Sequence, residues 1–249
     1  MVRSWLSRSH SGVREIAGLT ALYGVYELVR GAGGENVQAA MQHTRDIVDL
    51  ERAVGVYVEH GVQQTVETIP MAPALLGLGY VLFHFVGTAA LLVWLHRRHP
   101  DRFPMVRTTF VVATALALVG YVLFPAAPPR LAQLGFSDTV TSATGLDLSS
   151  DLLGALYNPF AAVPSLHFGY ALIVGAVLAT VATRRWVRAI GALYPAVMLL
   201  IIVGTGNHFI FDAVLGGLVV VAGWLTARAV LEAPAPRTSG RRIATARTA

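Results

Sequence analysis

Hydrophobic positions along the chain gather in long, nearly uninterrupted runs. A helix that crosses a bilayer needs about 20 mostly apolar residues, and several runs approach that length. They cover residues 14–30, 71–95, 106–124, 163–182, 186–204 and 209–230. The first run carries Arg14, Glu15 and Glu27 and is the least apolar of the set. The pattern predicts an all-α, polytopic membrane protein built as a six-transmembrane-helix bundle.

The stretches between the runs are polar enough to lie outside a bilayer. Residues 31–70 mix acidic side chains with apolar ones at loose helical spacing, which is typical of an amphipathic helix on the membrane surface or over the end of the bundle. Residues 125–162 are rich in Pro, Ser, Thr, Gly and Asp and are expected to cover a site. Residues 233–249 predict a disordered tail, so residues 1–232 are expected to form a single membrane-embedded domain with a core at about 35–230.

Composition agrees with a membrane protein. The chain is 55% hydrophobic and 13% charged, whereas soluble domains are about 25% charged. The absence of cysteine excludes disulfides and thiolate chemistry. All 19 basic residues are arginine, and the formal net charge is +5.

The positions of the arginines predict the orientation of the chain. Most precede the first run, separate the second run from the third and the fourth from the fifth, or follow the last run. The remaining ones are Arg30, Arg45, Arg52 and Arg130. Because arginine-rich segments stay inside, we expect a multi-pass protein of the cell membrane with both termini in the cytoplasm. The same rule explains the net charge without a nucleic-acid partner.

Two histidines open membrane-length runs, and one of them has a carboxylate one helical turn further on. His208 and Asp212 are four residues apart, so on a helix they share one face. A carboxylate that accepts the ring N–H fixes the tautomer and makes the other ring nitrogen a better nucleophile. The helix start beneath His208 also favours an anion. An ionisable pair in a membrane span indicates function by default.

The segment Pro164-Ser165-Leu166-His167 is a helix start with a second histidine. Free N–H groups and the Ser165 hydroxyl are suited to phosphate oxygens, and His167 is placed to give a proton to a leaving alkoxide. Arg130 follows three prolines at the end of the third run, and its guanidinium fork suits phosphate. The predicted orientation puts Arg130, His167 and His208 on the extracytoplasmic side.

Pro-Ser-x-His followed by His-x-x-x-Asp resembles the type-2 phosphatidic acid phosphatase superfamily. Pro-Ser-Leu-His, Ala-Pro-Pro-Arg after the third run and the region 49–59 are most similar to the branch of inositol phosphorylceramide synthases and related bacterial membrane proteins. The resemblance covers residues 35–230. It implies a six-helix bundle of this superfamily's type, with His208 as nucleophile, Asp212 as its orienting partner, His167 as general acid and base, and Arg130 as a phosphate ligand.

Some cations of the superfamily's motifs are missing. The chain has no lysine, and Ile201 and Ile202 stand where Ser-Arg is usual upstream of the nucleophile. Phosphate binding is therefore expected to depend on Arg130, helix N-termini and Asn207, and the transferase-like branch is favoured.

These observations predict a lipid phosphatase or phosphotransferase that works through a phosphohistidine without metal or cofactor. The substrate is expected to be a lipid phosphate or phosphodiester from the bilayer, and the acceptor to be water, a lipid or a polyol. The alternative is a catalytically inactive membrane scaffold or transporter that keeps the fold. Tyr80 and His84, in the second run, are expected to hydrogen-bond within the bundle. Oligomeric state is not predicted.

Overall fold

A computed structural model describes residues 18, 21, 24–25, 36–145 and 158–233 of the chain. In this part the structure is helical, apart from one isolated bridge between Ala126 and Ala161. The longer helices are α2 (Val37–Ala53), α3 (Glu59–Thr68), α4 (Ala72–Val81), the π-helix η1 (Leu82–Gly87), α5 (Thr88–Arg98), α6 (Phe103–Leu123), α9 (Leu166–Val181), α10 (Arg185–Gly204) and α11 (Ile210–Leu231). Two short ones are the 3₁₀-helix η2 (Pro129–Leu131) and α7 (Thr139–Thr144).

Four helices are long and apolar enough to cross a membrane. The first is the continuous helix Ala72–Arg98, which consists of α4, η1 and α5. The other three are α6, α10 and α11. The predicted run at 163–182 becomes α9, which is apolar but has only 16 residues. The run at 14–30 and the tail after residue 233 lie almost wholly outside the described residues. The chain is therefore a multi-pass membrane protein, and the count of six spans stays a prediction.

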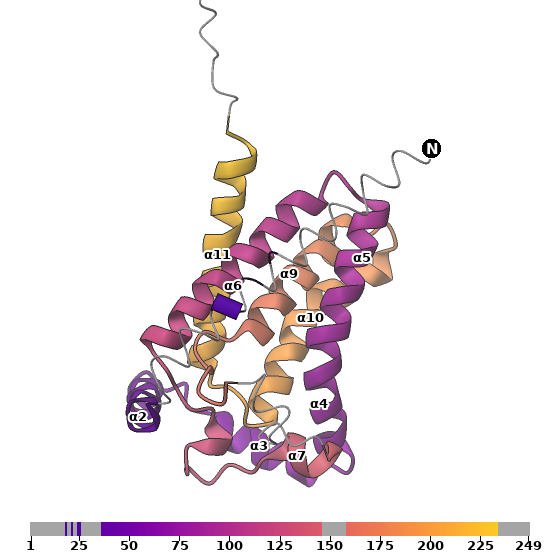
Figure 1. Ribbon diagram of the computed structural model, residues 1–249. Coiled ribbons are helices and arrows are strands. Elements are labelled where there is room, and N and C mark those ends of the chain that lie inside the picture. Colours follow the sequence, from indigo (N-terminus) through magenta and orange to yellow (C-terminus); the bar gives the residue numbers. More distant parts are fainter. Residues whose placement is uncertain (1–17, 19–20, 22–23, 26–35, 146–157, 234–249) are drawn as a thin grey trace, which may run out of the picture.

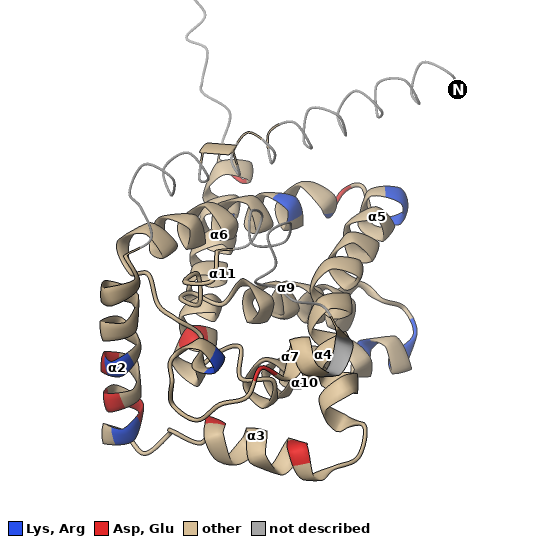
Figure 2. Ribbon diagram, turned by 60° about the horizontal axis from the view of Figure 1, so that its bottom comes forward, with Lys and Arg blue, Asp and Glu red and all other residues tan. Residues whose placement is uncertain are grey.

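Charged and apolar residues are separated as a bilayer requires. Figure 2 shows the charged residues on α2, α3 and the ends of the bundle helices, while α6 and α9 are uncharged along most of their length. Large apolar side chains such as Leu75, Leu193 and Leu218 are more than half exposed on the outer surface of the bundle. These exposed surfaces fit contact with lipid tails.

Helix α9 lies at the centre of the bundle and packs against α5, α6, α10 and α11 (Figure 1). Glycines let its backbone approach its neighbours closely. A Cβ on Gly175 of α9 would lie 2.6 Å from the carbonyl oxygen of Gly191 in α10. A Cβ on Gly216 of α11 would overlap the carbonyl oxygen of Ser165 just before α9.

Helices α2 and α3 pack over one end of the bundle, so the structure favours a cap over a surface helix for residues 31–70. One face of α2 is buried at helical spacing, from Ala40 to Glu51. The Thr44 hydroxyl accepts a hydrogen bond from the Ala127 N–H at 2.9 Å, and it lies 3.0 Å from the Ala127 carbonyl oxygen. The Gln63 amide of α3 pairs in the same way with the backbone of Ser137. The cap consists of two helices where one was expected.

A substitution at Gly216, which lies against Ser165, tests how closely α9 and α11 pack. Gly216→Ala should destabilise the protein by about 1–3 kcal/mol or more, because the new methyl group has no space and overpacking is destabilising. Gly217→Ala is the matched control, since its Cβ would make only an ordinary 3.4 Å contact with Leu172. Thermal unfolding in detergent micelles measures both. Equal midpoints for the two variants would contradict the close approach.

Candidate active site

The loop between α10 and α11 presents His208 at one end of the bundle. The N–H groups of Asn207 and His208 both donate to the carbonyl of Ile202, at 3.0 and 3.1 Å. Gly206 has a φ of +66°, a conformation that suits glycine. The chain therefore turns sharply after α10, and His208 lies immediately before the first turn of α11.

His208 and Asp212 form the predicted pair. Nδ1 of His208 lies 3.1 Å from Oδ2 of Asp212, and both residues are buried. The same Oδ2 accepts a hydrogen bond from the Phe209 N–H at 3.0 Å. The carboxylate therefore has a fixed direction, and with the ring proton on Nδ1 the Nε2 lone pair of His208 faces away from it.

His167 lies across from this pair, in the first turn of α9. Its ring centroid is 5.6 Å from that of His208. The ring stacks on Tyr80 and on His84, with centroids 4.0 Å away in each case. Ser165 caps α9, because its hydroxyl accepts from the Phe168 N–H at 3.3 Å. The structure thus brings the two predicted histidines together from segments about 40 residues apart in sequence.

Arg130 reaches the same loop from η2. Its N–H donates to the carbonyl of Gly206 (2.9 Å), its Nε donates to Oδ1 of Asn207 (2.8 Å), and Nη1 lies 3.5 Å from Asp138. Asn207 in turn donates to the hydroxyl of Thr205 at 2.9 Å. Arg130 and Asn207, both predicted as substrate ligands, are therefore tied to each other, and they hold the loop that carries His208.

Carboxylates occupy the N-terminus of α11. The Ile210 N–H donates to Glu59 at 2.9 Å and the Phe211 N–H donates to Glu51 at 2.7 Å, while the Phe209 N–H already donates to Asp212. These backbone groups were expected to favour an anion, and in this structure they already donate to carboxyl groups of the protein itself.

Glu51 and Glu59 contribute to the site, although the sequence analysis did not identify them as site residues. Both side chains are buried, at 2% and 0% exposure. Burial, helped by the neighbouring Glu59 and opposed by the Phe211 N–H, raises the pKa of Glu51 to about 8. Glu51 is therefore mostly protonated at neutral pH. The available signal was its place on the apolar stripe of α2, one turn after Ile47 and Val48.

A cavity of about 470 Å³ opens onto the two histidines. It lies between η1 and α5 on one side and α6 and α9 on the other. The polar residues that line it are Tyr80, His84, Thr88, Thr114, Tyr121, Asn158, His167, Tyr170 and His208. Within the described ranges, no group of three or more His, Asp or Glu side chains is arranged to hold a metal ion.

Comparison with known proteins agrees with the resemblance given by the motifs. The model of the PAP2 superfamily matches residues 45–226, which is most of the chain. The chain belongs to the PAP2 superfamily. It is also 33% identical over 132 residues to the phosphoinositol dihydroceramide synthase of Bacteroides thetaiotaomicron, a match that covers 47% of this chain and 42% of the relative. The chain therefore matches less than half of the relative's length. No solved structure matches it.

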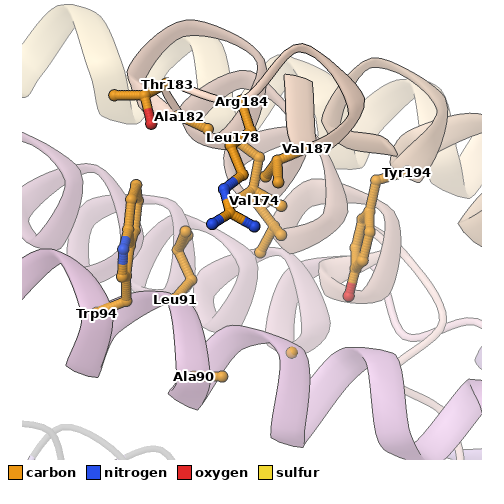
Figure 3. Close-up of a pocket in the computed structure, with 11 residues that line it drawn as sticks. Ala90, Leu91, Trp94, Val174, Leu178, Ala182, Thr183, Arg184, Val187 and Tyr194 are labelled. Atoms are coloured by element: carbon orange, nitrogen blue, oxygen red, sulfur yellow. The ribbon is translucent and has the colours of Figure 1, made fainter. Parts of the chain in front are cut away.

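This PAP2 protein has a second cavity, of about 400 Å³, toward the other end of the bundle (Figure 3). Leu91, Trp94 and Val174 line it, and the guanidinium of Arg184 lies among them. Neither His167 nor His208 lines this cavity, so it is separate from the candidate active site.

The raised pKa of Glu51 predicts a pH-dependent stability. A carboxyl whose pKa is higher in the folded protein adds stability below its unfolded pKa, and that stability is lost as the pH rises. Between about pH 4.5 and pH 8 the unfolding midpoint should therefore fall, by an amount equivalent to a few kcal/mol. Glu51→Gln should flatten this slope, because glutamine does not ionise.

Thermal unfolding in detergent across that pH range measures the effect. Glu232→Gln is the control, since Glu232 is exposed at the far end of α11. A slope that is the same in the parent and in Glu51→Gln would show that Glu51 is already ionised.

Proposed function

We propose that this protein cleaves a lipid phosphoester through a phosphohistidine on His208, at the extracytoplasmic face of the membrane. It is a phosphatase or phosphotransferase that needs no metal or cofactor. The catalytic residues are His208, His167 and Asp212. The proposal rests on the resemblance of the motifs, on family membership and, above all, on the pairing of His208 with Asp212 opposite His167.

The single observation that carries the proposal is the 3.1 Å contact between His208 Nδ1 and Asp212 Oδ2. A buried carboxylate that accepts the Nδ1 proton leaves Nε2 as an unprotonated nucleophile. It also stabilises the positive charge that the ring acquires when Nε2 bonds to phosphorus. The second acceptor contact, from the Phe209 N–H, keeps the carboxylate in this orientation.

In the first step, Nε2 of His208 attacks phosphorus and the bond from phosphorus to the leaving alkoxide oxygen breaks. His167 gives that oxygen a proton. Its Nε2 is buried and has no hydrogen-bond partner within the described residues, so it is available for this role. Phosphorus is then held on His208 while the alcohol departs.

In the second step, an acceptor hydroxyl gives its proton to His167, and its oxygen attacks phosphorus while the bond to His208 Nε2 breaks. The acceptor is water or an alcohol. The relative from Bacteroides thetaiotaomicron is named as a synthase of phosphoinositol dihydroceramide. That name supports transfer of a phosphorylated head group to a lipid alcohol as the main reaction.

Arg130, Ser165 and Asn207 are proposed to bind the phosphate. Arg130 is the buried arginine of the described part of the chain, and its backbone is bonded to Gly206, two residues before His208. A positive charge beside His208 would stabilise the bound phosphate, because the N–H groups at the start of α11 already donate to carboxyl groups of the protein. The guanidinium would bind the phosphate while it keeps its bond to Asn207.

The extracytoplasmic location follows from the distribution of arginine. Arg97, Arg98, Arg184, Arg185 and Arg228 lie at helix ends opposite the candidate site. If this end is cytoplasmic, as the positive-inside rule predicts, the two histidines are near the outer surface.

Single-cysteine labelling tests the orientation, because the chain contains no cysteine. A cysteine introduced at Ser142, which is exposed on α7, should react with an impermeant maleimide added to intact cells. A cysteine at Arg98, at the far end of α5, should react only after lysis. The reverse result would place the site in the cytoplasm.

Trapping the intermediate tests the mechanism. Phosphatidylinositol labelled at its phosphorus, supplied without an alcohol acceptor, should label the protein in an acid-labile form. His208→Ala should remove the label, and Asp212→Asn should slow labelling by about 10²-fold or more through lost orientation of the ring. His96→Ala, far from the site, is the matched control. Labelling that persists in His208→Ala would exclude this nucleophile, and a folded parent without label or turnover would favour an inactive scaffold.

A further inference from the structure

The cavity beside the two histidines has an amphipathic wall. Phe85, Leu92, Leu118 and Leu166 form its apolar part. Phe85 is 64% exposed, so the edge of the cavity reaches the outer, lipid-facing surface of the bundle. A ligand that enters from the bilayer would meet apolar side chains first and polar ones deeper in.

Three buried polar atoms on this wall have no hydrogen-bond partner within the described part of the chain. They are His84 Nδ1, Thr88 Oγ1 and His167 Nε2. An unsatisfied buried polar group destabilises a protein by about 1–3 kcal/mol, so such groups are rare and need an explanation. All three line one cavity, which indicates that a ligand supplies their partners.

Thr88 lacks a hydrogen bond that several threonines of the described helices make. A helical threonine commonly donates to the carbonyl four residues earlier. Here that bond is made by Thr44, Thr65, Thr109, Thr114, Thr180, Thr205 and Thr226. Thr88 does not make it, and its hydroxyl lines the cavity instead.

The π-helix explains how His84 and Thr88 come to this wall. Helix η1 interrupts the long span between α4 and α5, and such insertions are frequent at functional sites. The Tyr194 hydroxyl supports it by donating to the carbonyl of Phe83 at 2.8 Å. The His84 ring is held between the rings of His167 (4.0 Å) and Tyr170 (5.0 Å). His84 is therefore held beside the proposed acid and base by ring stacking, and its Nδ1 does not make the bundle hydrogen bond expected from the sequence.

We propose that His84 and Thr88 form the binding site for the hydroxyl group of a lipid alcohol, the acceptor of the transfer reaction. This inference rests on the proposed function. An imidazole and a hydroxyl both accept and donate hydrogen bonds, so together they suit an alcohol oxygen, whereas a phosphate would be drawn to a guanidinium such as that of Arg130. The apolar edge of the cavity suits an alcohol that carries an acyl or alkyl chain, and disfavours a free polyol.

The subsite places the acceptor where the second step needs it. The hydroxyl bound by His84 and Thr88 lies beside His167, which takes its proton as the oxygen attacks phosphorus on His208. The bond between phosphorus and Nε2 of His208 then breaks, and the phosphorylated head group leaves on the acceptor. Without these two contacts, water would compete more successfully for the phosphohistidine.

The partition between transfer and hydrolysis tests the subsite. Phosphatidylinositol with a labelled head group is the donor and short-chain dihydroceramide is the acceptor, both in detergent micelles. In Thr88→Val and His84→Phe, the rate of labelling of His208 should stay near that of the parent. The ratio of transfer to hydrolysis should fall about fivefold to tenfold, the effect expected from the loss of one hydrogen bond. The KM for dihydroceramide should rise by a similar factor.

Matched variants separate this effect from structural damage. Thr226→Val removes a hydroxyl that is bonded within its own helix, and His96→Phe changes a histidine remote from the cavity. Both should keep the parent ratio. His84→Asn retains a hydrogen-bonding group and should recover part of the transfer lost in His84→Phe. A parent protein that forms no phosphohistidine would contradict the proposed function, whereas normal labelling with an unchanged ratio in Thr88→Val would contradict only the subsite.

A binding measurement gives a readout without turnover. In the His208→Ala protein, short-chain dihydroceramide should raise the thermal midpoint, and adding Thr88→Val should reduce that rise relative to adding Thr226→Val. Equal rises in the two double variants, or a rise produced by free inositol and not by dihydroceramide, would overturn the proposal.

Discussion

Three backbone N–H groups at the start of α11 are each bonded to a buried carboxylate, and the arrangement of the site depends on them. Asp212 comes from the helix itself, whereas Glu59 and Glu51 come from α3 and α2. The same contacts therefore fasten the cap to the bundle and fix the turn that carries His208. Because a buried carboxyl group left without its hydrogen-bond partner would be destabilising, the cap and the nucleophile are expected to be lost together.

This arrangement determines which groups of the protein are available to bind a phosphate. In many anion sites the N-terminus of a helix supplies the donors, but here the protein's own carboxylates are bound there. In the proposed mechanism, the carboxylate of Asp212 favours a positively charged imidazole once Nε2 has bonded to phosphorus. The opposing charge on the phosphate would come from Arg130, whose guanidinium donates to Asn207 and lies 3.5 Å from Asp138. These contacts hold Arg130 beside the loop that carries His208.

The spans and the paired histidines could be predicted from the sequence because their signals are local. Long apolar runs and the four-residue spacing of His208 and Asp212 are visible in one segment at a time. The roles of Glu51 and Glu59 are not local, because each is defined by a partner more than 150 residues away. Acidic residues in an outer segment are ordinarily solvated, so the place of Glu51 on the apolar stripe of α2 is a weak signal that does not identify its partner. The π-helix is hidden for a similar reason, since Leu82–Gly87 has the composition of any apolar span.

The short length of α9 has a consequence for the surrounding bilayer. Its 16 residues extend roughly 24 Å, whereas the hydrocarbon core of a bilayer is about 30 Å thick. Its neighbour α10 has 20 residues, so it continues about one turn past the level at which α9 begins. The first turn of α9 is therefore set back from the ends of the adjacent helices. If the proposed function holds, a lipid head group would have to sink below those of neighbouring lipids to reach His167. Hydrophobic mismatch changes this depth, so the thickness of the host membrane would then affect how readily a substrate reaches the site.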